Sequence, residues 1–376
     1  MPKWKKYYSL EKGLAGRKKG GPVNLFIFIS AVGLILLMPL AGILLTGGII
    51  QPYLDFPPRP IITSHPSFSA PVFLAFLLII LISVLPFFRK GLIVKHRISS
   101  PVNRTLPWWG VAAFFSLGGF WILAWTRWEW LSFLQPHTFF PLWLCWIICV
   151  NALTYRASGQ CLMVKSPFRF MALFFISACF WWIFEYLNRF VGNWYYSGSR
   201  YSAGTYFALA FLSFSTVLPA VESMKDYLLT FSRFSDGFKE MPCLRAFEYP
   251  WTGICLILMA CILLLLTSVF PNQLFFLIWI CPFFIFLGCL VFSGKPHTFT
   301  NVKKGDYTLV AAYAAASLVC GFFWEMFNFY SLARWQYSIP YVQVLHLFEM
   351  PVLGYAGYLP FGLECGLIIG LVLKPQ

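Results

Sequence analysis

The chain has 376 residues, of which 59% are hydrophobic and only 11% charged, and this composition excludes an ordinary soluble globular protein. The net charge of +15 would suggest nucleic-acid binding in a soluble protein, but Lys and Arg mark the cytoplasmic side of membrane proteins. We therefore expect the lipid bilayer, and no nucleic acid, as the partner of this chain.

Ten apolar segments are long enough to cross a bilayer, which takes about 20 mostly apolar residues. The basic N-terminal tail, residues 1–22, leads into a first segment that is too long for a signal-peptide core, so we expect that segment to be retained. The sequence predicts an all-α polytopic membrane protein with about ten transmembrane helices. The predicted spans cover residues 23–50, 71–88, 107–126, 139–155, 169–190, 204–223, 251–270, 273–293, 308–330 and 350–373.

The loops alternate in basic charge along all ten predicted spans. Internal loops on one side carry three or more Lys or Arg residues, and loops on the other side carry at most two. The positive-inside rule then places both termini in the cytoplasm. We expect the protein in a bacterial cytoplasmic membrane.

An internal repeat covers the third to the tenth predicted span. Corresponding residues are 140 to 143 positions apart (250 − 107 = 143, 325 − 185 = 140, 364 − 222 = 142). Four spans is an even number, so both copies enter the membrane with the same polarity, as in parallel repeats. We expect a two-span unit at residues 23–106, a first four-span repeat at 107–249 and a second at 250–376. The copies read Glu185-x-x-Asn188 with Trp194-x-Tyr196, and Glu325-x-x-Asn328 with Trp335-x-Tyr337.

Four glutamates of the repeat lie in or at the ends of spans, and no Lys or Arg lies deep in any span to neutralise them. Carboxyl groups in a bilayer normally face a protein interior or a water cavity, and protonated glutamates there suit acid–base chemistry. Structural hydrogen bonding between helices is the alternative. Arg189 can pair with Glu185 on the same helix face, and a proline is expected to kink a span just before Glu222 and Glu364. The candidate catalytic residues are Glu325 and Glu364 first, then Glu185 and Glu222.

Polar and aromatic residues of the repeat are candidates for substrate binding. The two asparagines lie on the same helix face as their glutamates, so each can orient a carboxyl group or bind a substrate oxygen, or else cap the helix end. The aromatic residues can line a site, or else anchor the protein at the membrane interface. The candidates are Asn188, Asn328, Trp194, Trp335, Tyr196 and Tyr337.

The usual cofactor and metal signatures do not occur in the sequence. It contains no phosphate-binding glycine loop, no dinucleotide fingerprint and no Glu-x-x-His or His-x-x-x-His pair. We expect no cofactor and no metal, with a hard cation held by glutamates as an open alternative.

The chain resembles the lycopene-cyclase type of integral membrane protein. The resemblance rests on repeated spans, Phe184-Glu185, and the order of proline then glutamate at Pro219/Glu222 and Pro360/Glu364. It implies an isoprenoid or other apolar lipid as substrate and proton-initiated chemistry.

Three functions remain open from the sequence. The first is an enzyme that uses its intramembrane glutamates for acid–base chemistry on a lipid or isoprenoid. The second is a proton-coupled transporter or flippase, since parallel repeats and intramembrane carboxyl groups also occur in such carriers. The third is a structural or assembly role in the membrane.

Overall fold

The structure is a computed structural model that describes residues 22–57, 64–93, 105–197 and 201–373. The predicted basic tail lies outside these residues, apart from Pro22. The longer helices are α2 (Pro22–Leu45), α4 (Ala70–Ile93), α5 (Trp108–Trp125), α6 (Phe139–Ser158), α8 (Pro167–Val191), α9 (Ala203–Phe214), α10 (Val217–Leu228), α12 (Pro250–Val269), α14 (Cys281–Phe292), α15 (Thr308–Phe329) and α16 (Tyr358–Val372).

Short elements connect these helices. The single α-turns are α3 (Gln51–Leu54), α7 (Leu162–Lys165), α11 (Ser232–Ser235) and α13 (Pro271–Leu274). The 3-10 turns are η1 (Glu129–Leu131), η2 (Gln135–His137), η3 (Ala246–Glu248), η4 (Phe275–Trp279), η5 (Val302–Lys304) and η6 (Val352–Gly357). Two small antiparallel ribbons pair β1 (Trp194–Ser197) with β2 (Arg334–Tyr337), and β3 (His346–Leu347) with β4 (Met350–Pro351).

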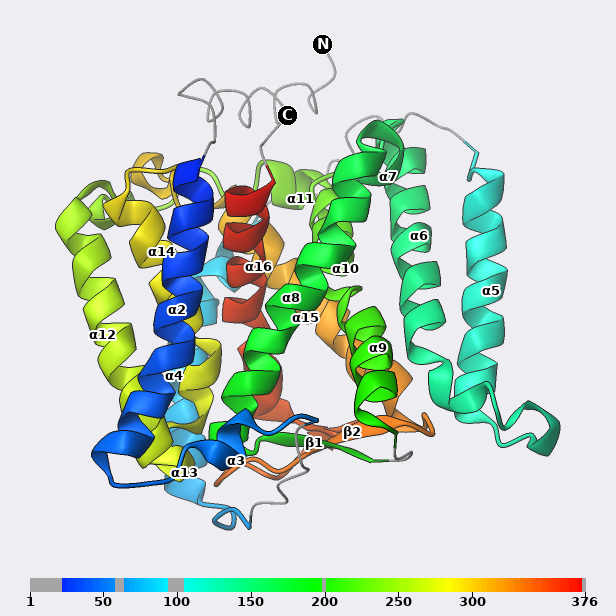
Figure 1. Cartoon of the computed structure of the whole chain (residues 1–376). Helices are drawn as coiled ribbons and strands as arrows, with labels where there is room; N and C mark the ends of the chain where they lie inside the picture. The colour runs from blue at the N-terminus through cyan, green and yellow to red at the C-terminus, as the bar shows by residue number, and fades with distance from the viewer. Residues whose placement is uncertain (1–21, 58–63, 94–104, 198–200, 374–376) are drawn as a thin grey trace.

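The described residues form nine helices that are long and apolar enough to cross a membrane, when α9 and α10 are counted as one helix and η6 is counted with α16. The predicted eighth span, 273–293, is not one straight helix, because α13 with η4 meets α14 at a bend of 46°. Counting this bent pair as one crossing gives ten spans. In Figure 1 the start of α2 and the end of α16 lie at the same end of the bundle, which favours an even number of crossings.

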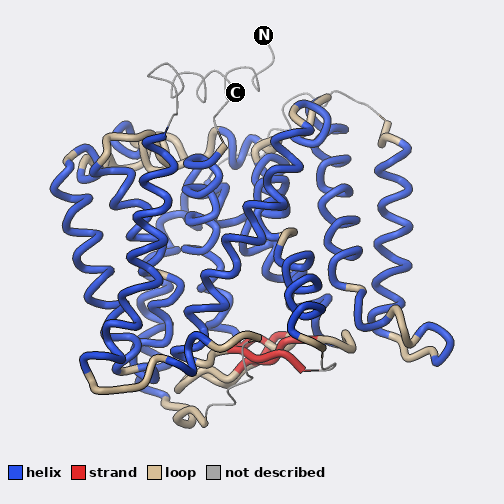
Figure 2. The backbone as a smooth tube through the Cα atoms, viewed as in Figure 1, coloured by secondary structure: helices blue, strands red, loops and turns tan. Residues whose placement is uncertain are grey.

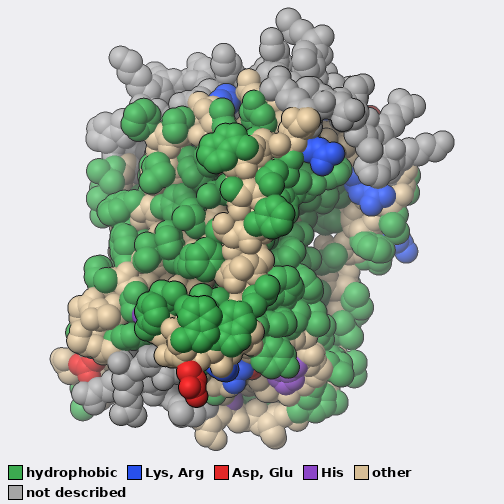
Figure 3. Space-filling view, turned by 90° about the vertical axis from the view of Figure 1, so that its right-hand side faces the viewer, with side chains coloured by type: hydrophobic (Ala, Val, Ile, Leu, Met, Phe, Trp, Pro, Cys, Tyr) green, Lys and Arg blue, Asp and Glu red, His purple; other side chains and the backbone are tan. Residues whose placement is uncertain are grey.

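The surface supports a membrane location. Seen from the side, the middle of the molecule is covered with hydrophobic side chains, and most Lys and Arg side chains lie toward its upper part (Figure 3). Exposed side chains of this kind form an apolar belt that only a hydrocarbon environment would cover.

Close helix packing depends on small residues in the helical hairpin of α12 and α14. A side chain at Gly253 would meet the backbone of α14, and a side chain at Gly288 would meet the backbone of Gly253. Only glycine lets two helices approach this closely, as is common between membrane helices.

The two prolines of the repeat begin helices instead of bending them. Pro219 is the third residue of α10 and Pro360 is the third residue of α16, where a missing N–H costs nothing. The interruption lies before each proline, at Ser215–Thr216 in the first copy and at the turn η6 in the second. The structure therefore has a break between two helical segments before each proline, in place of the expected kink just before each glutamate.

Candidate functional site

The two copies of the repeat motif meet in the ribbon of β1 and β2, at the end of the bundle opposite the start of α2 (Figure 2). In the antiparallel register Trp194 lies opposite Tyr337, and Tyr196 lies opposite Trp335. The equivalent positions are separated by the repeat offset (335 − 194 = 141, 337 − 196 = 141). Each pair therefore joins the Trp of one copy to the Tyr of the other.

The two asparagines hold this ribbon by the same pair of bonds. Asn188 Nδ2 donates to the carbonyl of Trp194 at 2.7 Å, and the Trp194 N–H donates to Asn188 Oδ1 at 3.3 Å. Asn328 makes the corresponding bonds with the Trp335 backbone at 2.8 and 2.9 Å. Both amide groups thus serve the backbone, so we assign these residues to positioning the strands and not to binding a ligand.

Glu185 is the centre of a hydrogen-bond network in the first copy. Its Oε1 accepts bonds from the Tyr196 hydroxyl at 2.5 Å and from the indoles of Trp181 and Trp194 at 3.0 and 3.1 Å. The glutamate is buried on α8. Three donors on one oxygen satisfy this carboxyl group well.

The expected ion pair between Arg189 and Glu185 does not form. Arg189 donates instead to the carbonyls of Tyr53 and Asp55, at 2.7 and 2.9 Å. This arginine therefore attaches the segment around α3 to α8.

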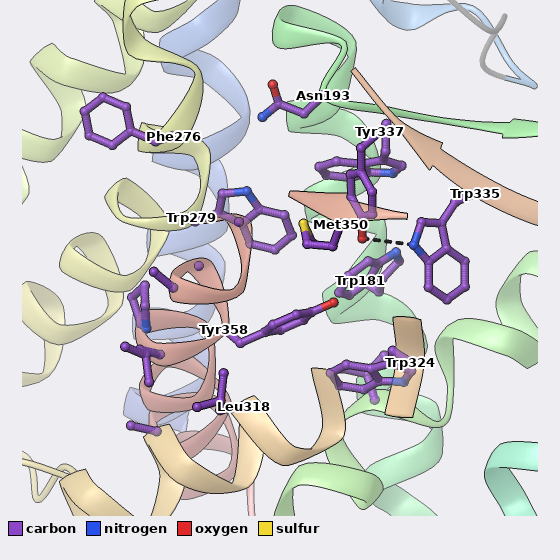
Figure 4. A pocket seen from close by; sticks show the side chains of 18 of the residues that line it. Trp181, Asn193, Phe276, Trp279, Leu318, Trp324, Trp335, Tyr337, Met350 and Tyr358 are labelled. Carbon is purple, nitrogen blue, oxygen red and sulfur yellow. Dashed lines mark hydrogen bonds between the residues drawn. The ribbon is translucent and has the colours of Figure 1, made fainter. Parts of the chain in front are cut away.

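Glu325 is the corresponding centre in the second copy. Its Oε1 accepts bonds from the hydroxyls of Tyr337 and Tyr358 at 2.7 and 2.6 Å, and the Trp335 indole donates to the Tyr337 oxygen at 2.9 Å (Figure 4). Glu325 is fully buried, and its Oε2 has no hydrogen-bond partner in the described part of the chain. One carboxyl oxygen is therefore left for a proton or a further contact.

The two copies supply the additional aromatic donor from different positions. The first copy has Trp181 on α8, and the offset of 140 places Gly321 at the equivalent position on α15. The second copy has Tyr358, and the offset of 142 places Thr216 at the equivalent position. A side chain at Gly321 would clash with the Tyr358 ring, so glycine there makes room for the tyrosine.

An apolar cavity of about 970 Å³ lies against these tyrosines and tryptophans. This volume is at the upper end of the roughly 300–1,000 Å³ found for ligand pockets. The four glutamates are not among its lining residues, so a ligand would meet the aromatic layer in front of Glu185 and Glu325. Both copies contribute to the lining, which includes Tyr196, Tyr337, Tyr358, Trp181, Trp194 and Trp335. Figure 4 shows Trp181, Trp335, Tyr337 and Tyr358 among them.

The hydroxyls of the ribbon are donors at all ordinary pH values. Burial, followed by the charge of Glu185, raises the pKa of Tyr196 well above its usual value of 10. Burial and Glu325 raise the pKa of Tyr337 in the same way. Each tyrosine therefore presents a protonated oxygen to the cavity while its hydrogen points to a glutamate.

Glu222 lies in a buried ion cluster, contrary to the expectation that no basic side chain neutralises it. Lys225 Nζ lies 3.0 Å and Arg169 Nη2 lies 3.7 Å from Glu222 Oε1. Tyr313 donates to Oε2 at 2.8 Å, and Lys225 also pairs with Asp226 at 2.8 Å. The sequence misled here because Lys225 directly follows the apolar segment, whereas the helix α10 continues and buries it.

Glu364 has the opposite environment. It is fully buried near the middle of α16, and neither of its oxygens has a hydrogen-bond partner in the described residues. Each of the three residues that contact Glu222 corresponds to a leucine in the other copy of the repeat, at an offset of 140 or 142. The equivalent pairs are Arg169 and Leu309, Lys225 and Leu367, and Tyr313 and Leu173.

Three residues of the site were not expected from the sequence. Trp181 and Tyr358 belong to the donor layer, and the exchange of large and small residues between the copies could have indicated them. Asn193 lines the cavity, donates to the Phe275 carbonyl at 3.1 Å, and has a buried Oδ1 with no partner in the described residues. Its place directly before Trp194 was the only signal.

No group of three or more His, Cys, Asp or Glu residues within the described ranges could hold a metal ion. Comparison with protein-family models, with curated proteins and with solved structures found no match for the chain. The class that the fold defines is an integral membrane protein with many spans.

Proposed function

We propose that this integral membrane protein is an enzyme that performs acid–base chemistry on an apolar lipid or isoprenoid chain. One observation carries the proposal: the hydroxyls of Tyr337 and Tyr358 both donate to Glu325, and both tyrosines line the apolar cavity. The resemblance to lycopene-cyclase-type proteins favours an isoprenoid among such substrates.

The hydrogen bonds define how a proton can move. The hydroxyl of Tyr337 or Tyr358 gives its proton to a double-bond carbon of the chain, and protonated Glu325 supplies the replacement proton to the tyrosine oxygen. The positive charge that forms on the chain disappears when the reverse transfer removes a proton from a different carbon. The substrate gains and loses one proton, so a double-bond shift or ring closure of this kind needs no oxidant or reductant. Positioned acids and bases typically accelerate such steps by about 10²–10⁴-fold.

We further propose that the chain is built from two parallel four-span units, residues 107–249 and 250–376, behind a two-span unit at 23–106. The symmetric pairing of β1 with β2 supports this arrangement, because equivalent residues of the two units face each other. Both units would then supply a single shared site.

The lipid and pigment profile of host membranes, measured by mass spectrometry, tests the enzymatic proposal. Wild-type protein should produce a new species or a mass change that is absent without the protein and absent with Glu325→Gln. Glu248→Gln is the matched control, because Glu248 pairs with Lys303 at the surface, 2.7 Å apart. A wild-type product profile from well-inserted Glu325→Gln protein would reject the proposal.

A transporter or flippase is the second candidate, and the broken span of α9 and α10 favours it. Residues from both helices line the cavity, and interrupted helices at such sites are common in carriers. Proton-dependent flux of a lipid across reconstituted vesicles, together with unchanged lipid masses, would support transport over chemistry. If Glu325→Gln changes only stability, a structural or assembly role is the better description.

A further inference from the structure

Helix α4 packs more loosely than any other candidate span in the described residues. It has 24 residues and the composition of a membrane span, yet none of its residues is buried. In every other candidate span, at least a fifth of the residues in the most apolar 18-residue stretch are buried inside the protein. A helix with so little packing is held mainly by its ends and by lipid.

Aromatic contacts hold α4 near both ends. Toward its start the ring of Phe76 lies 5.0 Å from the ring of Phe276, and toward its end the ring of Phe87 lies 5.9 Å from the ring of Tyr307. Pairs of this geometry contribute about 0.5–1.5 kcal/mol beyond their buried area. They fix the ends of the helix and leave its middle free of close packing.

The middle of α4 faces the cavity. Small side chains on α15 form part of the lining opposite α4. The lining residues concerned are Ile80, Ser83 and Val84 on α4, and Ala311, Ala314 and Ala315 on α15.

The cavity is long, and it has tyrosine hydroxyls at one end and Arg233 of α11 at the other. Lining residues of α4 run from Phe76 to Leu92, and 16 steps at about 1.5 Å give roughly 24 Å. That length is most of the ~30 Å thickness of the hydrocarbon core. The hydroxyls of Tyr337 and Tyr358 lie near β2 and the start of α16 (Figure 4). Such a space fits an extended apolar chain with its reactive part near those hydroxyls.

We propose that one long apolar chain of a bilayer lipid enters this cavity sideways from the hydrocarbon core, past α4, and then lies along α4. Lateral movement of α4 breaks few contacts, because none of its residues is buried in the protein. The inference deepens the proposed function by naming the shape and route of its substrate, and it rests on that function only for what happens at the tyrosines.

Photolabelling in reconstituted vesicles tests both parts of the inference. The first probe is phosphatidylcholine with a diazirine on one acyl chain, and the second is the same lipid with a polyethylene glycol head group. Labelled residues are identified by peptide mass spectrometry. The matched variants are Ala314→Trp, which fills the cavity, and Ile82→Trp, which enlarges a residue of α4 that is 65% exposed and does not line it.

We expect both probes to label the cavity residues Leu318 and Tyr358, with at least a fivefold loss in Ala314→Trp and no loss in Ile82→Trp. Labelling confined to outward residues such as Ile82 would overturn the inference. Cavity labelling by the plain lipid alone would overturn the sideways route, since a bulky head group does not hinder a chain that enters from the bilayer. Cavity labelling without any product in host membranes would reject the proposed enzyme and leave this inference standing.

Discussion

The ring of Tyr358 lies against Gly321 in the space that any side chain at position 321 would occupy. In the first copy the equivalent position carries Trp181, which donates to Glu185 as Tyr358 donates to Glu325. The two copies thus supply the aromatic donor to their glutamates from different positions of the repeat.

Gly321→Ala should displace Tyr358 from Glu325. The added methyl group overpacks a buried helix contact, which typically costs about 1–3 kcal/mol of stability. Thermal unfolding in detergent measures the loss. Gly357→Ala is the control, because nothing lies within 4 Å of a side chain placed there. Equal stability of the two variants would contradict the packing described.

Tyr358→Phe should lower turnover while the protein stays folded. The ring remains, but the hydroxyl that joins the cavity to Glu325 is lost, and acid–base groups of this kind contribute about 10²–10⁴-fold. Product formation in host membranes, normalised to inserted protein, is the measurement. Glu185→Gln should have a smaller effect, since three donors already hold Glu185 in place. Wild-type turnover by Tyr358→Phe would remove this tyrosine from the mechanism.

Lys225→Met should destabilise the protein by about 3–5 kcal/mol, because it leaves the buried carboxylate of Glu222 without its nearest cation. Glu364→Gln should change stability by less than about 1 kcal/mol, since no hydrogen bond or ion pair of the described residues is lost. Chemical or thermal unfolding of both variants in the same detergent makes the comparison. The opposite order would show that Glu364 has a partner of its own.

The stability of the protein should fall between pH 6.5 and pH 4 because of His297. This histidine lies in the loop after α14, packed near Phe247, and burial lowers its pKa from 6.5 to about 4. The unfolded chain binds a proton in that range and the folded chain does not, so acid favours unfolding. Above pH 6.5 the contribution is constant. Melting temperatures of wild type and His297→Gln should therefore converge as the pH falls, and parallel curves would refute the assignment.

The spans and the motif could be predicted from the sequence because both depend on local signals. Hydrophobic length places nine helices within a few residues of their observed bounds, and the repeat singles out Trp194, Tyr196, Trp335 and Tyr337, which the structure then brings to one cavity. The breaks at Ser215–Thr216 and before α14 are followed by Pro219 and Pro282, but hydrophobic length alone runs straight through them. Tertiary packing decides those interruptions.

The neighbours of each glutamate could not be predicted, because they come from distant parts of the chain. Tyr313 reaches Glu222 across 91 positions, and Tyr358 reaches Glu325 across 33. Lys225 looked like a solvated loop residue until the extent of α10 was known. The carboxyl groups stand out in the sequence as candidates, but the hydroxyl layer beside them depends on side-chain directions that only the packed helices define.

The ribbon of β1 and β2 limits where the chain can change in length. Only Gly192 and Asn193 separate the end of α8 from Trp194, and a shift of one residue in a strand turns every side chain to the other face. A single insertion there would move Tyr196 away from Glu185 and, through the shared register, disturb Tyr337 in the other copy. Insertions should be tolerated in surface loops far from the ribbon. Between α8 and β1, however, Gly192 and Asn193 fix the distance from Glu185 to its tyrosine, and through the shared register they also fix the position of Tyr337.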